Sequence, residues 1–88
     1  MPDIDVIMPT FNSLTYLKEA IQSIRQQTLR SSRIVVVDDG SEDGTSDWLQ
    51  MQDDVLSHRQ ENKGAGAARN KAIKLSQAPL LAFLDLTP

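Results

Sequence analysis

The chain has 88 residues, which is enough for one small domain with a single hydrophobic core. Hydrophobic residues make up 40% of it and charged residues 24%, as in an ordinary globular protein and unlike a disordered chain. Nine basic and twelve acidic residues give a net charge of -3, and no segment concentrates Lys and Arg, so we expect no nucleic acid partner. The absence of cysteine excludes a disulfide framework and a thiolate nucleophile.

The N-terminal segment lacks the basic start and the long apolar run of a secretory signal, because Asp3 and Asp5 interrupt it. No stretch of the sequence is long enough in apolar residues to span a bilayer. We therefore expect a cytoplasmic chain without a membrane segment, although its parent protein could be associated with a membrane.

The first half of the chain predicts a strand, a helix and a second strand. The short apolar run at residues 4–8 ends before Pro9 and predicts the first strand. Apolar residues then recur at helical spacing from Leu17, which predicts an amphipathic helix ending near Gln27. The β-branched run at residues 34–37 is apolar at every position, as in a parallel strand covered on both faces. The candidate N-caps of the helix are Asn12, Ser13 and Thr15.

The second half repeats the alternation of helix and strand. Thr45 is the expected N-cap of a second helix, residues 55–59 suit a short third strand, residues 67–77 a third helix, and residues 80–84 a fourth strand. This order predicts an α/β fold, a Rossmann-like parallel sheet with helices on both faces. The third helix is expected to face inward with Ala68, Ala72, Ile73 and Leu75.

Ligands of such sheets bind beyond the carboxyl ends of the strands. Asp38 and Asp39 come directly after the most apolar run, where two neighbouring carboxylates repel each other unless a donor or a cation relieves them. These residues can cap a turn, or one carboxylate can accept hydrogen bonds from a nucleobase or a ribose. Both interpretations stay open on the residues alone.

The segment GAGAAR at residues 64–69 begins like a dinucleotide-binding fingerprint, but it follows the third strand and ends in Arg69. Its small residues suit a tight turn into a helix packed closely on the sheet. Arg69 could then pair with a phosphate or with Asp39.

Five motifs follow one another along the chain. They are VIMPTFN at residues 6–12, VVVDDGS at residues 35–41, DGT at residues 43–45, Gly64 with ARN at residues 68–70, and FLD at residues 83–85. Taken together, these motifs resemble those of the family 2 glycosyltransferases of GT-A fold. The resemblance covers nearly the whole chain, and it implies an enzyme that transfers a sugar, with inversion, from a nucleotide diphosphate, most simply UDP, to an acceptor.

The resemblance also implies the roles of individual residues. Phe11 takes the place of the family's usual base-stacking Tyr, Asp39 holds the edge of the base, and Asp85 is the first carboxylate of an Asp-x-Asp motif that binds Mn²⁺ or Mg²⁺. Thr87 stands where the second acidic residue of that motif is expected. The nucleotide-binding residues implied are Pro9, Thr10, Phe11, Asn12, Asp38, Asp39 and Arg69.

We expect residues 1–88 to be a single, truncated portion of a glycosyltransferase domain that binds the nucleotide-sugar. Family members are longer and carry the catalytic base in the part that this chain lacks, so we assign no catalytic residue and expect the isolated chain to be inactive. The alternatives are a non-catalytic nucleotide-binding or assembly module on the same scaffold and, less favoured, a receiver-like phosphoacceptor domain. A bare strand at residues 80–84 would also let the chain self-associate through its sheet edge.

Overall fold

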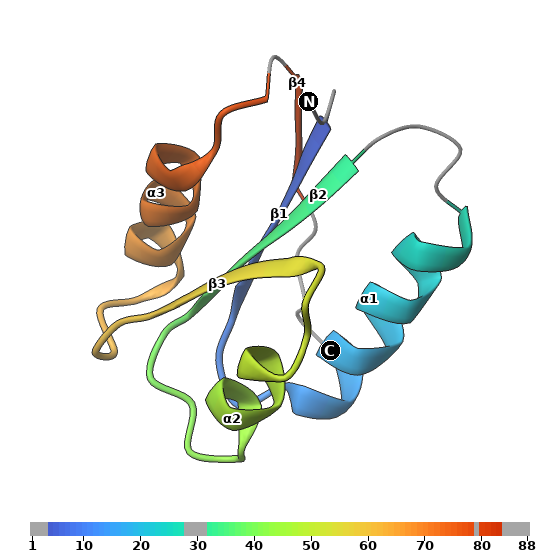
Figure 1. Ribbon diagram of the computed structural model, residues 1–88. Coiled ribbons are helices and arrows are strands. Elements are labelled where there is room, and N and C mark those ends of the chain that lie inside the picture. Colours follow the sequence, from blue (N-terminus) through green and yellow to red (C-terminus); the bar gives the residue numbers. More distant parts are fainter. Residues whose placement is uncertain (1–3, 28–31, 79, 84–88) are drawn as a thin grey trace.

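The computed structural model describes residues 4–27, 32–78 and 80–83. These residues form a parallel sheet with helices on both faces, which confirms the predicted fold class (Figure 1). No helix in this part of the chain is both long and apolar enough to cross a membrane. The elements in chain order are β1 (Ile4–Thr10), α1 (Leu14–Gln27), β2 (Ser32–Asp38), α2 (Thr45–Gln50), β3 (Val55–Arg59), α3 (Ala65–Leu75) and β4 (Leu80–Phe83).

The strands lie in the order β3-β2-β1-β4, and all neighbouring pairs are parallel. The register places Thr10 of β1 beside Asp38 of β2, and Asp38 beside Arg59 of β3. Since neighbours in a parallel register point to the same face, these side chains share one face at the carboxyl end of the sheet. That end carries the loops that lead into α1 and α2, at the bottom of Figure 1.

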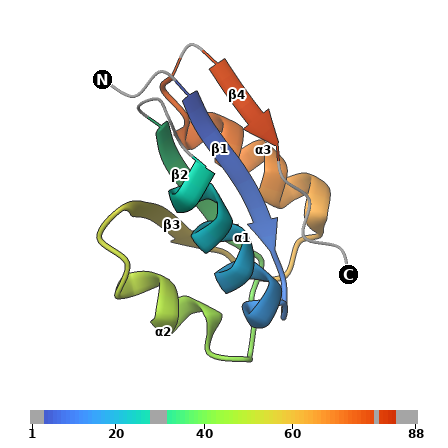
Figure 2. The same cartoon turned by 90° about the vertical axis from the view of Figure 1, so that its right-hand side faces the viewer.

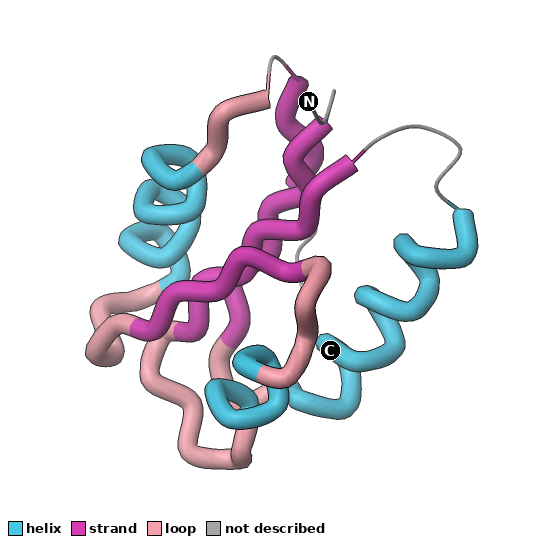
Figure 3. Tube along the Cα trace, in the orientation of Figure 1, coloured by secondary structure: helices cyan, strands magenta, loops and turns pink. Residues whose placement is uncertain are grey.

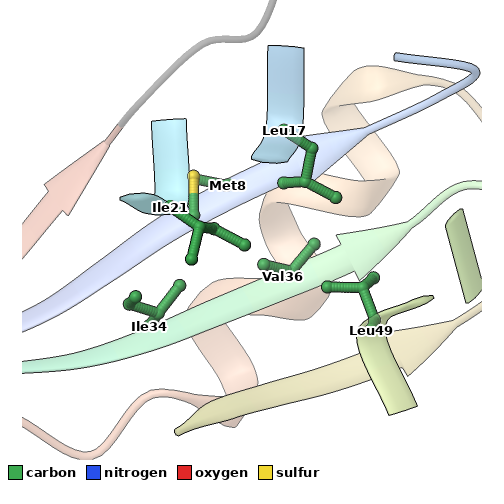
Figure 4. Packing of buried hydrophobic residues seen from close by; sticks show 6 residues of the cluster. All are labelled: Met8, Leu17, Ile21, Ile34, Val36 and Leu49. Atoms are coloured by element: carbon green, nitrogen blue, oxygen red, sulfur yellow. The ribbon is translucent and has the colours of Figure 1, made fainter. Parts of the chain in front are cut away.

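Each face of the sheet is covered by helices, as the tube in Figure 3 and the turned view in Figure 2 both show. On one face α1 and α2 bury a cluster in which side chains of both helices contact β1 and β2 (Figure 4). On the other face α3 buries a second cluster. Strand β2 contributes to both, which explains its unbroken apolar run. The first cluster comprises Met8, Leu17, Ile21, Ile34, Val36 and Leu49, and the second Ile7, Val35, Val37, Ala68 and Ala72.

Strand β1 is longer than expected, because it continues through Pro9 to Thr10. Proline has no N–H to donate to a neighbouring strand and is normally excluded from central strands. Within the described residues β4 pairs with β1 only as far as Ile7, so Pro9 lies where β1 pairs with β2 alone. In the described part of the sheet, no strand on the β4 side therefore requires a donor from Pro9.

The structure also corrects three helix predictions. Gly44, in a left-handed conformation with φ 87°, takes the N-cap position of α2, and Thr45 is the first helical residue. Ile73 of α3 is 39% exposed and not inward-facing, because Ala72 occupies the buried stripe and the next residue is turned about 100° around the helix. Helix α3 spans Ala65–Leu75, two residues earlier at both ends than predicted.

Candidate functional site

The loops that follow β1 and β2 are bonded to each other at the carboxyl end of the sheet. The Asn12 amide donates to Ser41 Oγ at 2.7 Å, and Asn12 Oδ1 accepts from the Glu42 amide at 2.8 Å. Asn12 has a φ of 48°, a conformation that Asn tolerates better than most residues. These two bonds hold the end of the β1 loop against the start of the β2 loop.

Asp43 connects the same two loops to the helices that follow them. Its Oδ2 accepts from the Leu14 amide at the start of α1 at 3.1 Å, and its Oδ1 accepts from the Thr45 amide at the start of α2 at 3.2 Å. A carboxylate is favourable at a helix N-terminus, because it satisfies exposed amides and complements the helix dipole. The predicted cap Ser13 instead donates its hydroxyl to the Phe11 carbonyl.

Asp38 is buried, with 1% of its surface exposed, and its two oxygens have different partners. Oδ1 accepts from the Ser41 amide at 2.9 Å, and Oδ2 forms an ion pair with Arg59 Nη1 at 3.0 Å. The same Nη1 donates to the Ser41 carbonyl at 2.9 Å. The buried charge of Asp38 is therefore compensated from the neighbouring strand β3.

Asp39 is also buried but faces a different set of donors. Its Oδ1 accepts from Gln60 Nε2 at 2.9 Å and from the Lys63 amide at 2.8 Å, and its Oδ2 accepts from the Gly64 amide at 2.9 Å. Burial raises the pKa of Asp39, but the hydrogen bonds from the Lys63 amide, Gln60 and the Gly64 amide outweigh burial, so the pKa lies below its usual value. Asp39 is thus ionised at neutral pH and orders the loop before α3.

Thr10 and Phe11 occupy the end of β1 between these anchors. The Thr10 carbonyl accepts from the Asp39 amide at 2.9 Å, which ties β1 to the turn after β2. Thr10 Oγ1 is buried, and within the described residues no hydrogen-bond partner is found for it. The Phe11 side chain, by contrast, is 45% exposed. An exposed aromatic ring at the carboxyl end of a parallel strand can be covered by a bound ligand, and an unpaired buried hydroxyl in the preceding residue is an uncommon feature of a folded protein.

The structure thus brings together the predicted residues of β1, β2 and their loops, namely Pro9, Thr10, Phe11, Asn12, Asp38 and Asp39. Arg69 lies in the first half of α3 and is exposed. Asp85, the predicted metal ligand, lies outside the described residues. Among the residues that are described, no group of three or more His, Cys, Asp or Glu side chains could hold a metal ion.

Two open hollows flank Arg59, with volumes of about 320 Å³ and 460 Å³. Thr10, Phe11 and Arg69 do not line either of them. Their walls include the acidic residues Glu42, Asp47 and Glu61, which would repel a diphosphate. We therefore do not place the candidate site in these hollows, although they are large.

The sequence did not predict the role of Arg59 at this end of the sheet, and it offered Ser41 and Asp43 only as members of the family motifs, without their hydrogen bonds. Arg59 ends the short strand predicted at residues 55–59, and its pairing with Asp38 depends on the register of β2 and β3. The available signal was its position at the carboxyl end of a strand, where charged residues of neighbouring parallel strands meet.

Comparison with known proteins places these motifs in one family. The model of "Glycosyl transferase family 2" matches residues 5–86, nearly the whole chain. This chain belongs to the family 2 glycosyltransferases. A relative is the validoxylamine A glucosyltransferase of Streptomyces hygroscopicus subsp. jinggangensis, 38% identical over 92 residues, which cover 97% of this chain and 22% of that protein.

Solved structures agree with the assignment to this glycosyltransferase family. S. aureus TarS 1-349 in complex with UDP has a TM-score of 0.85 at 30% identity, covering 97% of this chain and 27% of TarS 1-349, which was also solved with UDP-GlcNAc. The mannosyltransferase PcManGT of Pyrobaculum calidifontis, solved with GDP-Man and Mn²⁺, has a TM-score of 0.80 at 26% identity, covering 97% of this chain and 27% of that one. The chain spans 26% and 35% of the length of two Bacillus subtilis relatives. Most of each relative therefore has no counterpart in these residues.

Proposed function

We propose that this family 2 glycosyltransferase chain is the nucleotide-sugar-binding portion of an enzyme that transfers a sugar, with inversion, from a nucleotide diphosphate to an acceptor. The observation that carries the proposal is the end of β1, where Phe11 is 45% exposed and the preceding residue, Thr10, has a buried hydroxyl with no partner in the described residues. A nucleobase stacked on Phe11 would cover the ring, and aromatic stacking suits any base.

Asp39 supplies the preference for one kind of base. A carboxylate has about four acceptor positions, so its three hydrogen bonds to Gln60, Lys63 and Gly64 leave room for one further donor. Uracil offers a ring N–H on its pairing edge, whereas adenine has a ring acceptor there. The complexes of TarS with UDP and UDP-GlcNAc support a UDP-linked donor. Guanine also has a ring N–H, in keeping with the GDP-Man complex of PcManGT.

The diphosphate is assigned to Arg69 and to a divalent cation. Arg69 is an exposed cation on α3, whose N-terminal residues begin directly after the Asp39-bound Gly64. The Mn²⁺ in PcManGT supports a cation in the parent enzyme of this chain. Asp85, the only metal ligand predicted in this chain, lies outside the described residues. The described residues contain no group of three or more His, Cys, Asp or Glu side chains that could hold a metal ion, so we derive no step through the metal.

No base for the acceptor is assigned among these residues, and we propose that the isolated chain transfers no sugar. Inverting transfer needs a group that takes the acceptor's proton while donor and acceptor are held in line. A non-catalytic nucleotide-binding module is the second candidate, and the sequence feature that favours it is Thr87 at the second acidic position of the motif. The cytoplasmic location stays a prediction.

Nucleotide titration of the 88-residue chain tests the proposal. We expect weak binding of UDP and weaker binding of ADP in isothermal titration calorimetry, because uracil presents a ring N–H to Asp39 where adenine presents a ring acceptor. Phe11→Ala should weaken UDP binding roughly tenfold through loss of stacking. Tyr16→Ala is the matched control, since Tyr16 is 50% exposed on α1 and should leave UDP binding unchanged. ADP binding as tight as UDP binding would contradict the proposal.

A further inference from the structure

Hydrogen bonds connect Arg59 of β3 to Asp38, Ser41 and, through Ser41, to Asn12. The proposed function gives Arg59 no role. Its side chain is 47% exposed, yet Nη1 holds two separate groups, the buried carboxylate of Asp38 at 3.0 Å and the carbonyl of Ser41 at 2.9 Å. Asp38 in turn accepts from the Ser41 amide at 2.9 Å. Both backbone polar groups of Ser41 are therefore fixed, one by Arg59 directly and one by the carboxylate that Arg59 neutralises.

The fixed Ser41 in turn holds the loop after β1 in place through its hydroxyl group. Its hydroxyl accepts from the Asn12 amide at 2.7 Å, and the Thr10 carbonyl accepts from the Asp39 amide at 2.9 Å. Phe11 lies between these two anchors. The anchor at Thr10 belongs to the sheet, whereas the anchor at Asn12 depends on where the Ser41 hydroxyl is held.

We infer that Arg59 is a positioning residue for Phe11, acting through Asp38 and Ser41 to hold the 10–12 segment in the conformation that receives the base. This inference rests on the proposed function, since it assigns Arg59 to the same nucleotide site. Loss of the guanidinium leaves the Asp38 charge buried beside a single amide donor, so the turn at Ser41 must open to water or rearrange. The Asn12 amide then loses a fixed acceptor, and Phe11 is no longer held in place before the ligand arrives.

The test compares Arg59→Gln with Arg25→Gln in the full 88-residue chain, using UDP as the probe. Arg25 is a matched control, because it forms an ion pair with Asp54 at 2.6 Å and has a similar exposure of 38%, on α1 and away from this network. We expect Arg59→Gln to weaken UDP binding about tenfold, the effect of one lost charge-assisted hydrogen bond, and Arg25→Gln to leave it unchanged. Arg59→Lys keeps a cation with several donors and should recover part of the affinity.

Amide hydrogen exchange separates positioning from general stability. In Arg59→Gln the Asn12 amide should exchange about tenfold faster, while the Val36 amide in the core keeps its rate relative to Arg25→Gln. Equal acceleration at both amides, or an unchanged UDP affinity, would overturn the inference. If Arg59→Gln does not fold, Ser41→Ala removes only the acceptor of the Asn12 amide and carries the same expected loss of UDP affinity, so unchanged binding there overturns it too. A wild-type chain that does not bind UDP would defeat the proposed function, and the exchange rates would still decide whether Arg59 positions the loop.

Discussion

Two adjacent carboxylates, Asp38 and Asp39, have separate structural roles at the carboxyl end of β2. Asp38 pairs with Arg59 of β3 and with the turn at Ser41, whereas Asp39 accepts three hydrogen bonds from residues 60–64. The repulsion expected between them is relieved by different donors at each residue. Both are structural groups even before a ligand binds.

The structure changes the expected effect of Asp39→Ala on the stability of the fold. The sequence places Asp39 at a strand end outside the core, which favours a fold that tolerates Asp39→Ala. In the structure Asp39 is 4% exposed, and Ala would leave Gln60 Nε2 and the Lys63 and Gly64 amides without their acceptor. We expect a loss of about 2 kcal/mol in the free energy of unfolding, measured by urea denaturation.

Asp53→Ala is the control for this change, because Asp53 is an exposed residue in the loop before β3. It should alter the free energy of unfolding by less than about 0.5 kcal/mol. Equal stabilities of Asp39→Ala and Asp53→Ala would show that the donors around Asp39 find water or other acceptors at no cost.

Among the elements, the carboxylate of Asp5 links β1 to β2 and to the connection between α3 and β4, at the end of the sheet opposite the candidate site. Asp5 of β1 is fully buried, and its carboxylate accepts from Arg33 of β2 at 3.0 Å and 3.1 Å. The same carboxylate accepts from the amides of Gln77 and Ala78 at 2.8 Å and 3.1 Å, 72 and 73 residues further along the chain. One side chain therefore anchors residues 77 and 78, which follow α3, to β1.

This ion pair makes stability depend on pH. Burial raises the pKa of Asp5, but the hydrogen bonds from Arg33, Gln77 and Ala78 outweigh it, so the folded-state pKa lies below the ordinary value of 3.8. The contribution of Asp5 is therefore fully present above pH 3.8 and is lost as the pH falls through the lower folded-state value. We expect Asp5→Asn to cost about 3 kcal/mol at pH 7 and to lose less stability than the wild type as the pH falls below 3.8.

Urea unfolding at a series of pH values measures this difference. Asp53→Asn removes the same charge from an exposed position and should keep the wild-type dependence on pH. A dependence in Asp5→Asn as steep as in the wild type would assign the acid sensitivity to other carboxylates, of which Asp39 and Asp43 also have lowered pKa values.

At the scale of the whole molecule, β4 lies at one edge of the described sheet and leaves Leu81 40% exposed. An uncovered edge offers unpaired backbone groups to another chain. Self-association through this edge stays a prediction. The relatives extend far beyond the length of this chain, so most of their residues have no counterpart here.

We expect the 88-residue chain to self-associate at high concentration, and Leu81→Lys to reduce the association, because a charged side chain on an edge strand opposes pairing with a second strand. Sedimentation velocity over a range of concentrations measures the effect. Met51→Lys is the control, since Met51 is 70% exposed at the end of α2 and outside every strand. A wild-type chain that stays monomeric at all concentrations would remove the prediction.

Patterns in the sequence are enough to predict the order of the elements and the end of the sheet at which the candidate site lies. A strand or helix that is buried on a neighbour leaves a periodic pattern of apolar residues in the sequence. Such patterns occur at residues 4–8 and 34–37 and from Leu17 onward. Periodicity alone therefore suffices to place Pro9 to Asn12 and Asp38 to Asp39 at strand ends. The family motifs added the expected roles of Phe11 and Asp39.

The groups that hold these residues in place follow from the arrangement of the strands and loops in space. Arg59 is 21 residues from Asp38, and Asp43 is 29 residues from the Leu14 amide that it bonds. Such pairs depend on strand register and on the path of loops, and a hydrogen bond needs its two atoms within a few tenths of an ångström of the favoured distance. Periodicity carries no information at that scale, so the network that supports Phe11 is defined only when the strands lie side by side.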